Sequence, residues 1–183
     1  MKNRWIAGAC SLALILGMNS AMAENSNSGT RMGAQLAIAD ADGLDTGLAL
    51  VLTGIFPMPQ VHPAFTVEAE FTTTVSNPED SQSTPFGTIS AELSYFTLAG
   101  YGVWNHPVSP TIKLKGRIGL LYESLEVDFK SPFGNGSDDD TDIGLSYGFG
   151  AVFDIKQSID IIAEYTVIES DISHISAGVQ WSF

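Results

Sequence analysis

The chain has 183 residues, of which 44% are hydrophobic, and its formal net charge is −13. This length predicts a single domain, and the negative charge excludes nucleic acid as a partner because phosphate binding needs clustered lysine and arginine. The only cysteine is Cys10, so no disulfide can form within the chain.

Residues 1–23 are typical of a secretory signal peptide. A positively charged start precedes an apolar stretch, which ends at an A-x-A cleavage site, AMA, at residues 21–23. The apolar stretch is too short to cross a bilayer as a helix, and Cys10 precedes most of it, which argues against a lipoprotein. We therefore expect one mature domain over residues 24–183. All 21 carboxylates but only six of the eight Lys and Arg residues belong to it, so its net charge is −15.

Beyond the signal peptide, apolar residues recur at every second position, which is the period of a β-strand and not of a helix. In residues 65–72, for example, large apolar side chains alternate with Glu68, Glu70 and two threonines. Segments rich in Pro, Gly, Asn and Asp predict turns or loops at 41–45, 57–63, 76–87, 105–110 and 131–142. Short breaks between alternating segments predict two further turns at 155–158 and 169–171. The expected strands are 31–39, 47–53, 65–72, 89–104, 112–129, 143–154, 159–167 and 174–183.

One face of these strands is almost wholly apolar, and we place Leu93 and Tyr95 of the fourth strand on it. The other face carries charged, polar and glycine residues. In the fifth strand the apolar parity changes near Leu121, which predicts either a β-bulge or an extension beyond a membrane.

The same alternation could come from a water-soluble sandwich or lipocalin-like barrel, but two features favour a barrel that spans a membrane. The glycine-rich face suits a tightly curved interior, and large aromatic residues gather near the strand ends in two girdles. The predicted girdle residues are Phe56, Tyr101, Trp104, Tyr122, Tyr147 and Tyr165, with Phe129, Trp181 and Phe183 beside them.

These features resemble the small outer-membrane β-barrel family, of the eight-stranded OmpA and OmpX type. The resemblance covers the mature chain and rests on the AMA site, the eight alternating segments, the short turns between longer loops, and the ending SAGVQWSF. It implies an all-β, eight-stranded, antiparallel up-and-down transmembrane barrel in the outer membrane of a Gram-negative bacterium. It also implies that both termini lie in the periplasm and that the segments 41–45, 76–87, 130–142 and 169–171 face outward.

The last strand resembles the signal that the barrel-assembly machinery recognises in this family, with Val179, Trp181 and Phe183 as its residues. A well-packed final strand is the alternative interpretation. The resemblance thus implies this machinery, outer-membrane lipids and lipopolysaccharide as partners. We expect a monomer without a cofactor or metal.

Charged residues on the small face predict a polar core inside the barrel. Isolated charges there would be costly, so they should pair. We expect Arg117 to lie between Glu70 and Glu164, with Lys115 near Glu68. Such a core would close the barrel to solutes, and a narrow ion path is the alternative. The predicted lumen charge network comprises Glu68, Glu70, Glu92, Lys113, Lys115, Arg117 and Glu164.

Two other motifs suggest chemistry. The segment His174-Ile175-Ser176 resembles the H-x-S pair of outer-membrane lipid A deacylases, but the strand parity turns His174 and Ser176 toward the lumen and no acidic residue follows them. The run SDDDTD, residues 137–142, offers oxygens of the kind that hard cations prefer. It lacks the spacing of an EF-hand loop, so we expect a solvated loop.

The sequence therefore predicts an outer-membrane barrel with a structural or surface-interaction role, in envelope integrity or adhesion. A narrow pore or small-solute transport barrel is the main alternative. A lipid A-modifying enzyme and a soluble periplasmic barrel are the remaining alternatives, and we predict no enzyme activity.

Overall fold

The computed structural model of the chain describes residues 29–41, 45–77, 79–85, 87–132, 134–156, 158–168 and 172–182. The predicted signal peptide and Phe183 lie outside these ranges. Within them the chain forms β-strands joined by turns and short connections. The described part contains no helix long and apolar enough to cross a membrane.

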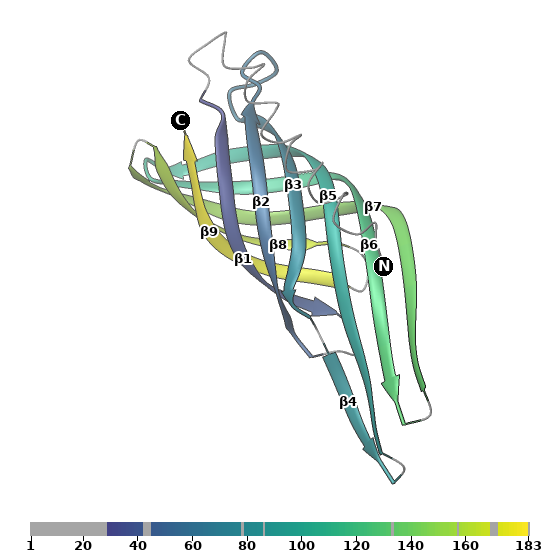
Figure 1. Cartoon of the computed structure of the whole chain (residues 1–183). Helices are drawn as coiled ribbons and strands as arrows, with labels where there is room; N and C mark the ends of the chain where they lie inside the picture. The colour runs from purple at the N-terminus through teal and green to yellow at the C-terminus, as the bar shows by residue number, and fades with distance from the viewer. Residues whose placement is uncertain are drawn as a thin grey trace.

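Every neighbouring pair of strands in the sheet is antiparallel, and the sheet closes into a ring because β3 pairs with β5. The strand β4 pairs with β5 beyond the point where β3 ends, so eight strands surround the lumen (Figure 1). This confirms the predicted eight-stranded up-and-down barrel. The strands are β1 (Arg31–Ala41), β2 (Gly47–Pro57), β3 (Phe65–Ser76), β4 (Glu79–Thr84), β5 (Gly87–Ser109), β6 (Ile112–Ser131), β7 (Gly134–Lys156), β8 (Ile159–Val167) and β9 (Ile172–Ser182).

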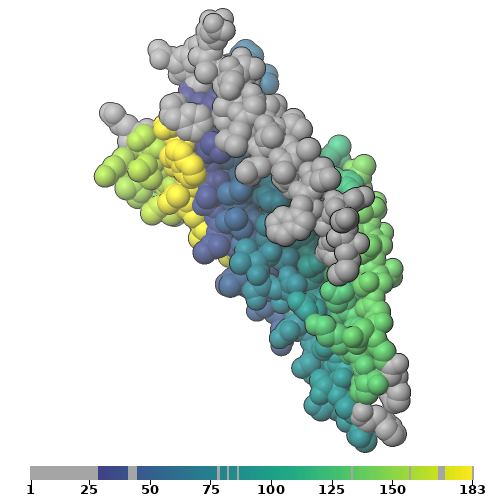
Figure 2. Space-filling view, in the orientation of Figure 1, coloured from purple at the N-terminus to yellow at the C-terminus, as the bar shows by residue number. Residues whose placement is uncertain are grey.

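The barrel is strongly asymmetric, because β5, β6 and β7 are about twice as long as most other strands. At the terminal end, where β1 begins and β9 ends, the strands finish together. At the opposite end β5, β6 and β7 continue beyond the ring and, together with β4, form what we call the projecting sheet (Figures 1 and 2). It consists of β4 with residues 87–95 of β5, 123–131 of β6 and 134–142 of β7.

The projecting sheet corrects two sequence predictions, because the segments 76–87 and 131–142 were expected to be loops. Residues 79–84 form β4, and all of residues 134–142 pair with β6 in an unbroken ladder. Both faces of these strands carry polar side chains. Neither face therefore shows the apolar alternation by which a strand is recognised in a sequence.

The direction of the side chains in β5 also differs from the prediction. Leu93 and Tyr95 were assigned to the lipid face, but their exposed fractions are 6% and 3%, and they point into the barrel. The segment of β5 that pairs with β3 is residues 96–104, so residues 87–95 lie above the ring, where a strand no longer needs an apolar outer face. The ladder between β5 and β6 runs without a register shift past Leu121. The parity change therefore reflects an extension and not a bulge.

Close strand packing explains one of the glycines on the inner face. A Cβ added at Gly119 of β6 would lie 2.0 Å from the carbonyl oxygen of Gly100 on β5. Gly116, on the lipid-facing side of the same strand, has open space around the equivalent position. Of these two glycines in β6, only Gly119 is therefore required by the packing of the barrel wall.

We expect Gly119→Ala to lower the free energy of unfolding by about 1–3 kcal/mol, because the added methyl group must push two strands apart. Gly116→Ala, the matched control, should leave it nearly unchanged. Urea unfolding of both variants in phospholipid vesicles measures the difference. Equal stability of the two variants would contradict the close approach at Gly119.

Candidate functional site

The middle of the lumen contains a cluster of charged side chains that come from three separate strands. Alternation along each strand turns Glu68 and Glu70 of β3, Lys115 and Arg117 of β6, and Glu164 of β8 toward the interior, where all five are buried. The cluster joins walls that are not neighbours in the sheet, since β5 separates β3 from β6 and β7 separates β6 from β8.

Arg117 is the centre of this cluster. Its guanidinium donates to Glu70 at 2.5 and 3.3 Å and to the hydroxyl oxygen of Thr166 at 2.5 Å. Its Nε lies 3.8 Å from Glu164, and its planar group stacks 4.3 Å from the ring centroid of Tyr101. Charge, hydrogen bonds and a cation–π contact thus hold one side chain in a fixed position across the lumen.

Lys115 completes the cluster from the next inward position of β6. Its Nζ lies 2.7 Å from Glu68 and 2.8 Å from Glu164. Gln35 of β1 donates to Glu164 at 3.0 Å and accepts a hydrogen bond from Ser176 of β9 at 2.9 Å. The network therefore extends to the strands on the far side of the barrel.

A second group of polar contacts lies toward the terminal end. Lys113 is only partly buried and pairs with Asp154 at 2.9 Å, so it belongs to this rim and not to the central cluster. Arg31 and Gln180 both donate to Asp160. A cavity of about 200 Å³ opens among these residues and reaches as far as Lys115 and Glu68.

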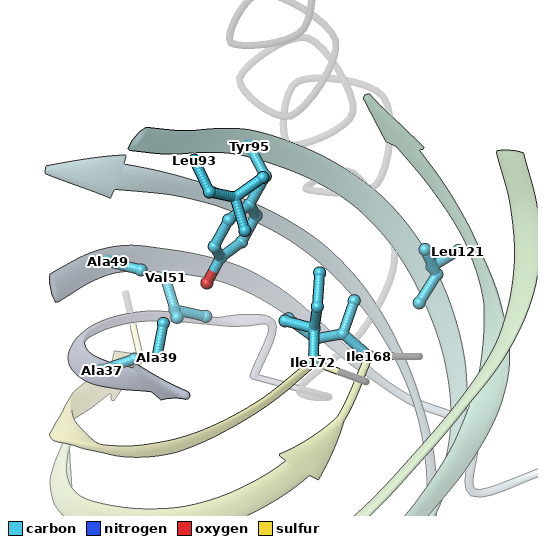
Figure 3. Close-up of a cluster of buried hydrophobic side chains, with 9 residues drawn as sticks. All are labelled: Ala37, Ala39, Ala49, Val51, Leu93, Tyr95, Leu121, Ile168 and Ile172. Atoms are coloured by element: carbon cyan, nitrogen blue, oxygen red, sulfur yellow. The ribbon is translucent and has the colours of Figure 1, made fainter. Parts of the chain in front are cut away.

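The interior becomes apolar on the other side of the charged cluster, toward the projecting sheet. Figure 3 shows the side chains of this apolar cluster pointing into the barrel from opposite walls, with the ring of Tyr95 reaching toward Val51. The polar lumen therefore ends at a layer of hydrocarbon side chains. The cluster comprises Ala37, Ala39, Ala49, Val51, Leu93, Tyr95, Leu121, Ile168 and Ile172.

Two predicted site residues lie elsewhere than the sequence analysis placed them. Glu92 was expected in the lumen, but it lies on the outer face of the projecting sheet, where it accepts from Asn77 at 2.9 Å and from Lys130 at 3.3 Å. These two contacts, the hydrogen bond from Asn77 first, lower the pKa of Glu92. Tyr101 was expected in an aromatic girdle, but it is 2% exposed and lies in the lumen against Arg117, with its hydroxyl 3.0 Å from Ser146.

The wrong placements of Glu92 and Tyr101 have the same cause as those of Leu93 and Tyr95: the inward face of β5 was assigned to the wrong set of alternate positions. The inward positions of β5 have odd numbers throughout, which puts Tyr101 inside and Glu92 outside. Apolar residues on both faces of β5 hide this parity in the sequence. Nothing in the sequence of β5 alone shows which of its two faces points into the lumen. The partner strand β6 carries its basic residues at odd positions, and these favour the odd positions as the inward ones.

The remaining predicted girdle residues face outward, and so do the described residues of the predicted insertion signal on the last strand. Trp104, Tyr122 and Tyr147 are exposed on the outer wall, whereas Phe56 and Tyr165 are partly covered there. Trp104 stacks on His62 of the turn at the terminal end, with ring centroids 4.5 Å apart. Of the predicted insertion signal, Val179 and Trp181 face outward from β9, and Phe183 lies outside the described residues.

His174 and Ser176 are both buried and face the lumen. Ser176 donates to Gln35, and within the described part of the chain neither ring nitrogen of His174 has a hydrogen-bond partner. The pair therefore lacks the serine–histidine hydrogen bond by which such residues act. Asp138, Asp140 and Asp142 lie on one face of β7 and Asp139 on the other. No group of three or more potential metal ligands converges among the described residues.

A closed ring of eight antiparallel strands, with apolar side chains outside and paired charges inside, defines an integral outer-membrane β-barrel. The sequence profile of the outer membrane protein beta-barrel domain family matches residues 9–183. The chain belongs to this family, which confirms the predicted resemblance and places the protein in the outer membrane. No curated protein sequence matches the chain significantly.

Several solved structures share the fold. Ail, the attachment invasion locus protein of Yersinia pestis, is 17% identical with a TM-score of 0.55, and the match covers 85% of this chain and 97% of Ail. Neisserial surface protein A is 15% identical with a TM-score of 0.59, covering 86% and 98%. OprG from Pseudomonas aeruginosa is 14% identical with a TM-score of 0.60, covering 85% and 96%. At these identities the likeness extends to the fold alone.

Removal of the central cation should destabilise the barrel strongly. We expect Arg117→Met to lower the free energy of unfolding by about 3–5 kcal/mol, because it leaves Glu70 buried without its partner. Lys113→Met, which breaks the partly exposed pair with Asp154, should cost about 1 kcal/mol or less. Urea unfolding in phospholipid vesicles provides the measurement. A loss at Arg117 no larger than at Lys113 would show that the central cluster does not hold the walls together.

Proposed function

We propose that this protein is a surface-interaction barrel, with a lumen closed to solutes and an acidic projecting sheet turned away from the cell. The observation that carries this proposal is the division of the molecule into a filled ring and a long sheet that extends from one end of it. The filled ring anchors the protein in the membrane, and the sheet provides the contact surface.

Two layers of side chains support a closed lumen. The central cluster crosses the barrel from β3 to β6 and β8, and the apolar cluster, which includes Leu93 and Tyr95 at the base of the projecting sheet, covers it from that end. An eight-stranded barrel is just wide enough for its own side chains to fill it. A hydrated ion would have to break the contacts of Arg117 and Lys115 and then cross an apolar layer.

The projecting sheet carries a strong negative charge. Among the described residues of the sheet, Lys130 is the only cation, and it is engaged by Glu92. This charge favours a partner with exposed lysine or arginine and repels polyanions. The carboxylates of the sheet are Glu79, Asp80, Glu92, Glu123, Glu126, Asp128, Asp138, Asp139, Asp140 and Asp142.

The related structures support a contact role in general but not the same ligand. Ail is named for attachment and invasion, and one of its structures contains the heparin analogue sucrose octasulfate. A sulfated sugar is a polyanion. The acidic sheet of the present protein should reject such a ligand, so we propose attachment to a cationic surface in its place.

A narrow pore is the second candidate, supported by the cavity of about 200 Å³ that opens at the terminal end. The cavity ends at Lys115 and Glu68, which is why we favour a closed lumen. We propose no enzyme activity, since His174 and Ser176 face the lumen and not the lipid. We further propose a monomer that meets the assembly machinery through its last strand.

Planar bilayer recordings test the closed lumen. We expect no steady, well-defined conductance from the wild-type protein, because Arg117 and Lys115 are held by carboxylates in the middle of the lumen. A porin reconstituted in the same way is the positive control. Steady channels from the wild-type protein, absent from a mock preparation, would establish the pore alternative.

Binding of polylysine to reconstituted protein tests the acidic sheet. We expect the triple variant Asp138→Asn, Asp140→Asn, Asp142→Asn to bind roughly tenfold more weakly at low salt, because three exposed charges are lost. Lys130→Met should bind more tightly, and high salt should reduce all these differences. Sucrose octasulfate should not bind. Equal polylysine affinity of the triple variant and the wild type would refute the proposed contact surface.

A further inference from the structure

The outer face of the barrel has a hollow of about 630 Å³ at the base of the projecting sheet. This volume lies within the usual range for small-molecule sites. Most of the side chains that line the hollow lie on the face of the sheet opposite the lumen network. Its lining comes from β3 with Asn77 beside it, β5, β6 and β7, and it combines hydroxyl, amide and carboxylate groups with the apolar side chains of Phe96 and Leu125.

The strand register shows how this lining is built. Thr73, Phe96, Ser124 and Thr141 are successive cross-strand neighbours and form one row across the four strands. Two residues further along the strands, Ser94, Glu126 and Asp139 form a second row. Cross-strand neighbours lie on the same face of a sheet, so the two rows present their side chains together.

The register also places the hollow at the edge of the membrane. The row on the other side of Phe96 consists of Leu98, Tyr122 and Ile143. Tyr122 and Ile143 are 41% and 69% exposed, which identifies this row as part of the lipid-facing band. One register step, about 7 Å, separates the row from Phe96. The hollow therefore begins where the hydrocarbon ends, at the depth of membrane headgroups.

The chemistry of the lining matches a sugar. Sugar hydroxyls donate to carboxylates and exchange hydrogen bonds with serine, threonine and asparagine, and their C–H faces pack against aromatic rings. Asn77, Glu126 and Asp139 supply the amide and the carboxylates. Phe96 supplies a ring at the apolar edge, 6.3 Å from that of Tyr122.

The charge of the hollow selects among sugars. Its lining contains two carboxylates and no basic residue, and Glu92 and Asp128 lie on the same face in the next row. Acidic or sulfated sugars would be repelled. Neutral sugars are compatible, and an ammonium group would add a favourable charge.

We propose that this hollow is a saccharide-binding site for a short neutral or amino-sugar oligosaccharide at the outer surface of the membrane. The site goes beyond the contact role of the acidic sheet, because it needs hydroxyl donors in its ligand and not merely positive charge. The oligosaccharide could be supplied by lipopolysaccharide of the same membrane or by an external glycan, and the experiment below separates these sources.

Isothermal titration of the reconstituted protein tests the site with three trisaccharides, built from glucosamine, glucose and galacturonic acid. We expect the glucosamine trimer to bind more tightly than the glucose trimer, and the acidic trimer not to bind. Asp139→Asn should weaken the glucosamine trimer about tenfold or more, because a hydrogen bond to a charged group is lost. Asp138→Asn is the matched control, since it removes the same charge from the neighbouring residue on the opposite face of β7. It should weaken binding of the positively charged glucosamine trimer less than Asp139→Asn does, and it should leave binding of the uncharged glucose trimer unchanged.

The glucose trimer separates this site from general attraction to the acidic sheet, because it carries no charge. Phe96→Leu and Ser124→Ala should each weaken binding of the glucose trimer several-fold. If Phe96→Leu disturbs folding, the smaller change Ser124→Ala still tests the site. Competition by lipopolysaccharide that carries core sugars, but not by lipid A, assigns the ligand to the same membrane. Lack of competition assigns it to an external glycan. The proposal is wrong if the glucose trimer does not bind, or if Asp138→Asn and Asp139→Asn weaken the glucosamine trimer equally.

Discussion

Arg117 shows the constraint on which this structure depends: a charge enclosed by a narrow barrel must find its partners inside. The ring of strands satisfies its own backbone hydrogen bonds, as any sheet within hydrocarbon must. Polar and charged side chains on the inner face are not paired by the sheet itself and need partners from other strands. The cluster around Arg117 satisfies them by connecting β3, β6 and β8, so the same contacts that neutralise the charges also brace the walls.

The same constraint explains why the lumen is not uniform. Charged residues occupy the middle, where they can reach one another, and polar pairs at the terminal end remain in contact with a small cavity. Toward the projecting sheet, Leu93, Leu121 and Ile172 replace them with an apolar layer. The interior thus resembles a conventional protein core at one level and a salt-bridge network at the next.

Beyond the ring, the physical rules change because the outer face of the sheet meets water in place of lipid, whereas Leu93 and Tyr95 keep the base of its inner face buried. The long strands β5, β6 and β7 continue without interruption, but their outer face changes from Tyr122 and Ile143 to Ser124, Glu126 and Asp139 within one or two register steps. This abrupt change creates a polar surface directly at the membrane edge. The acidic sheet above it and the hollow at its base are consequences of extending a barrel wall out of the lipid.

The sequence by itself determined the class of fold, since a period of two, turn residues and a clear difference between two faces are local properties of the chain. It also brought Glu68, Glu70, Lys115, Arg117 and Glu164 into one predicted interior, because parity along β3, β6 and β8 is unambiguous. The tertiary structure alone decided where the membrane ends along β5, and therefore on which side Glu92, Leu93 and Tyr101 lie. The physical reason is that alternation reports which residues share a face, whereas the solvent that wets each face depends on strands far away in the sequence.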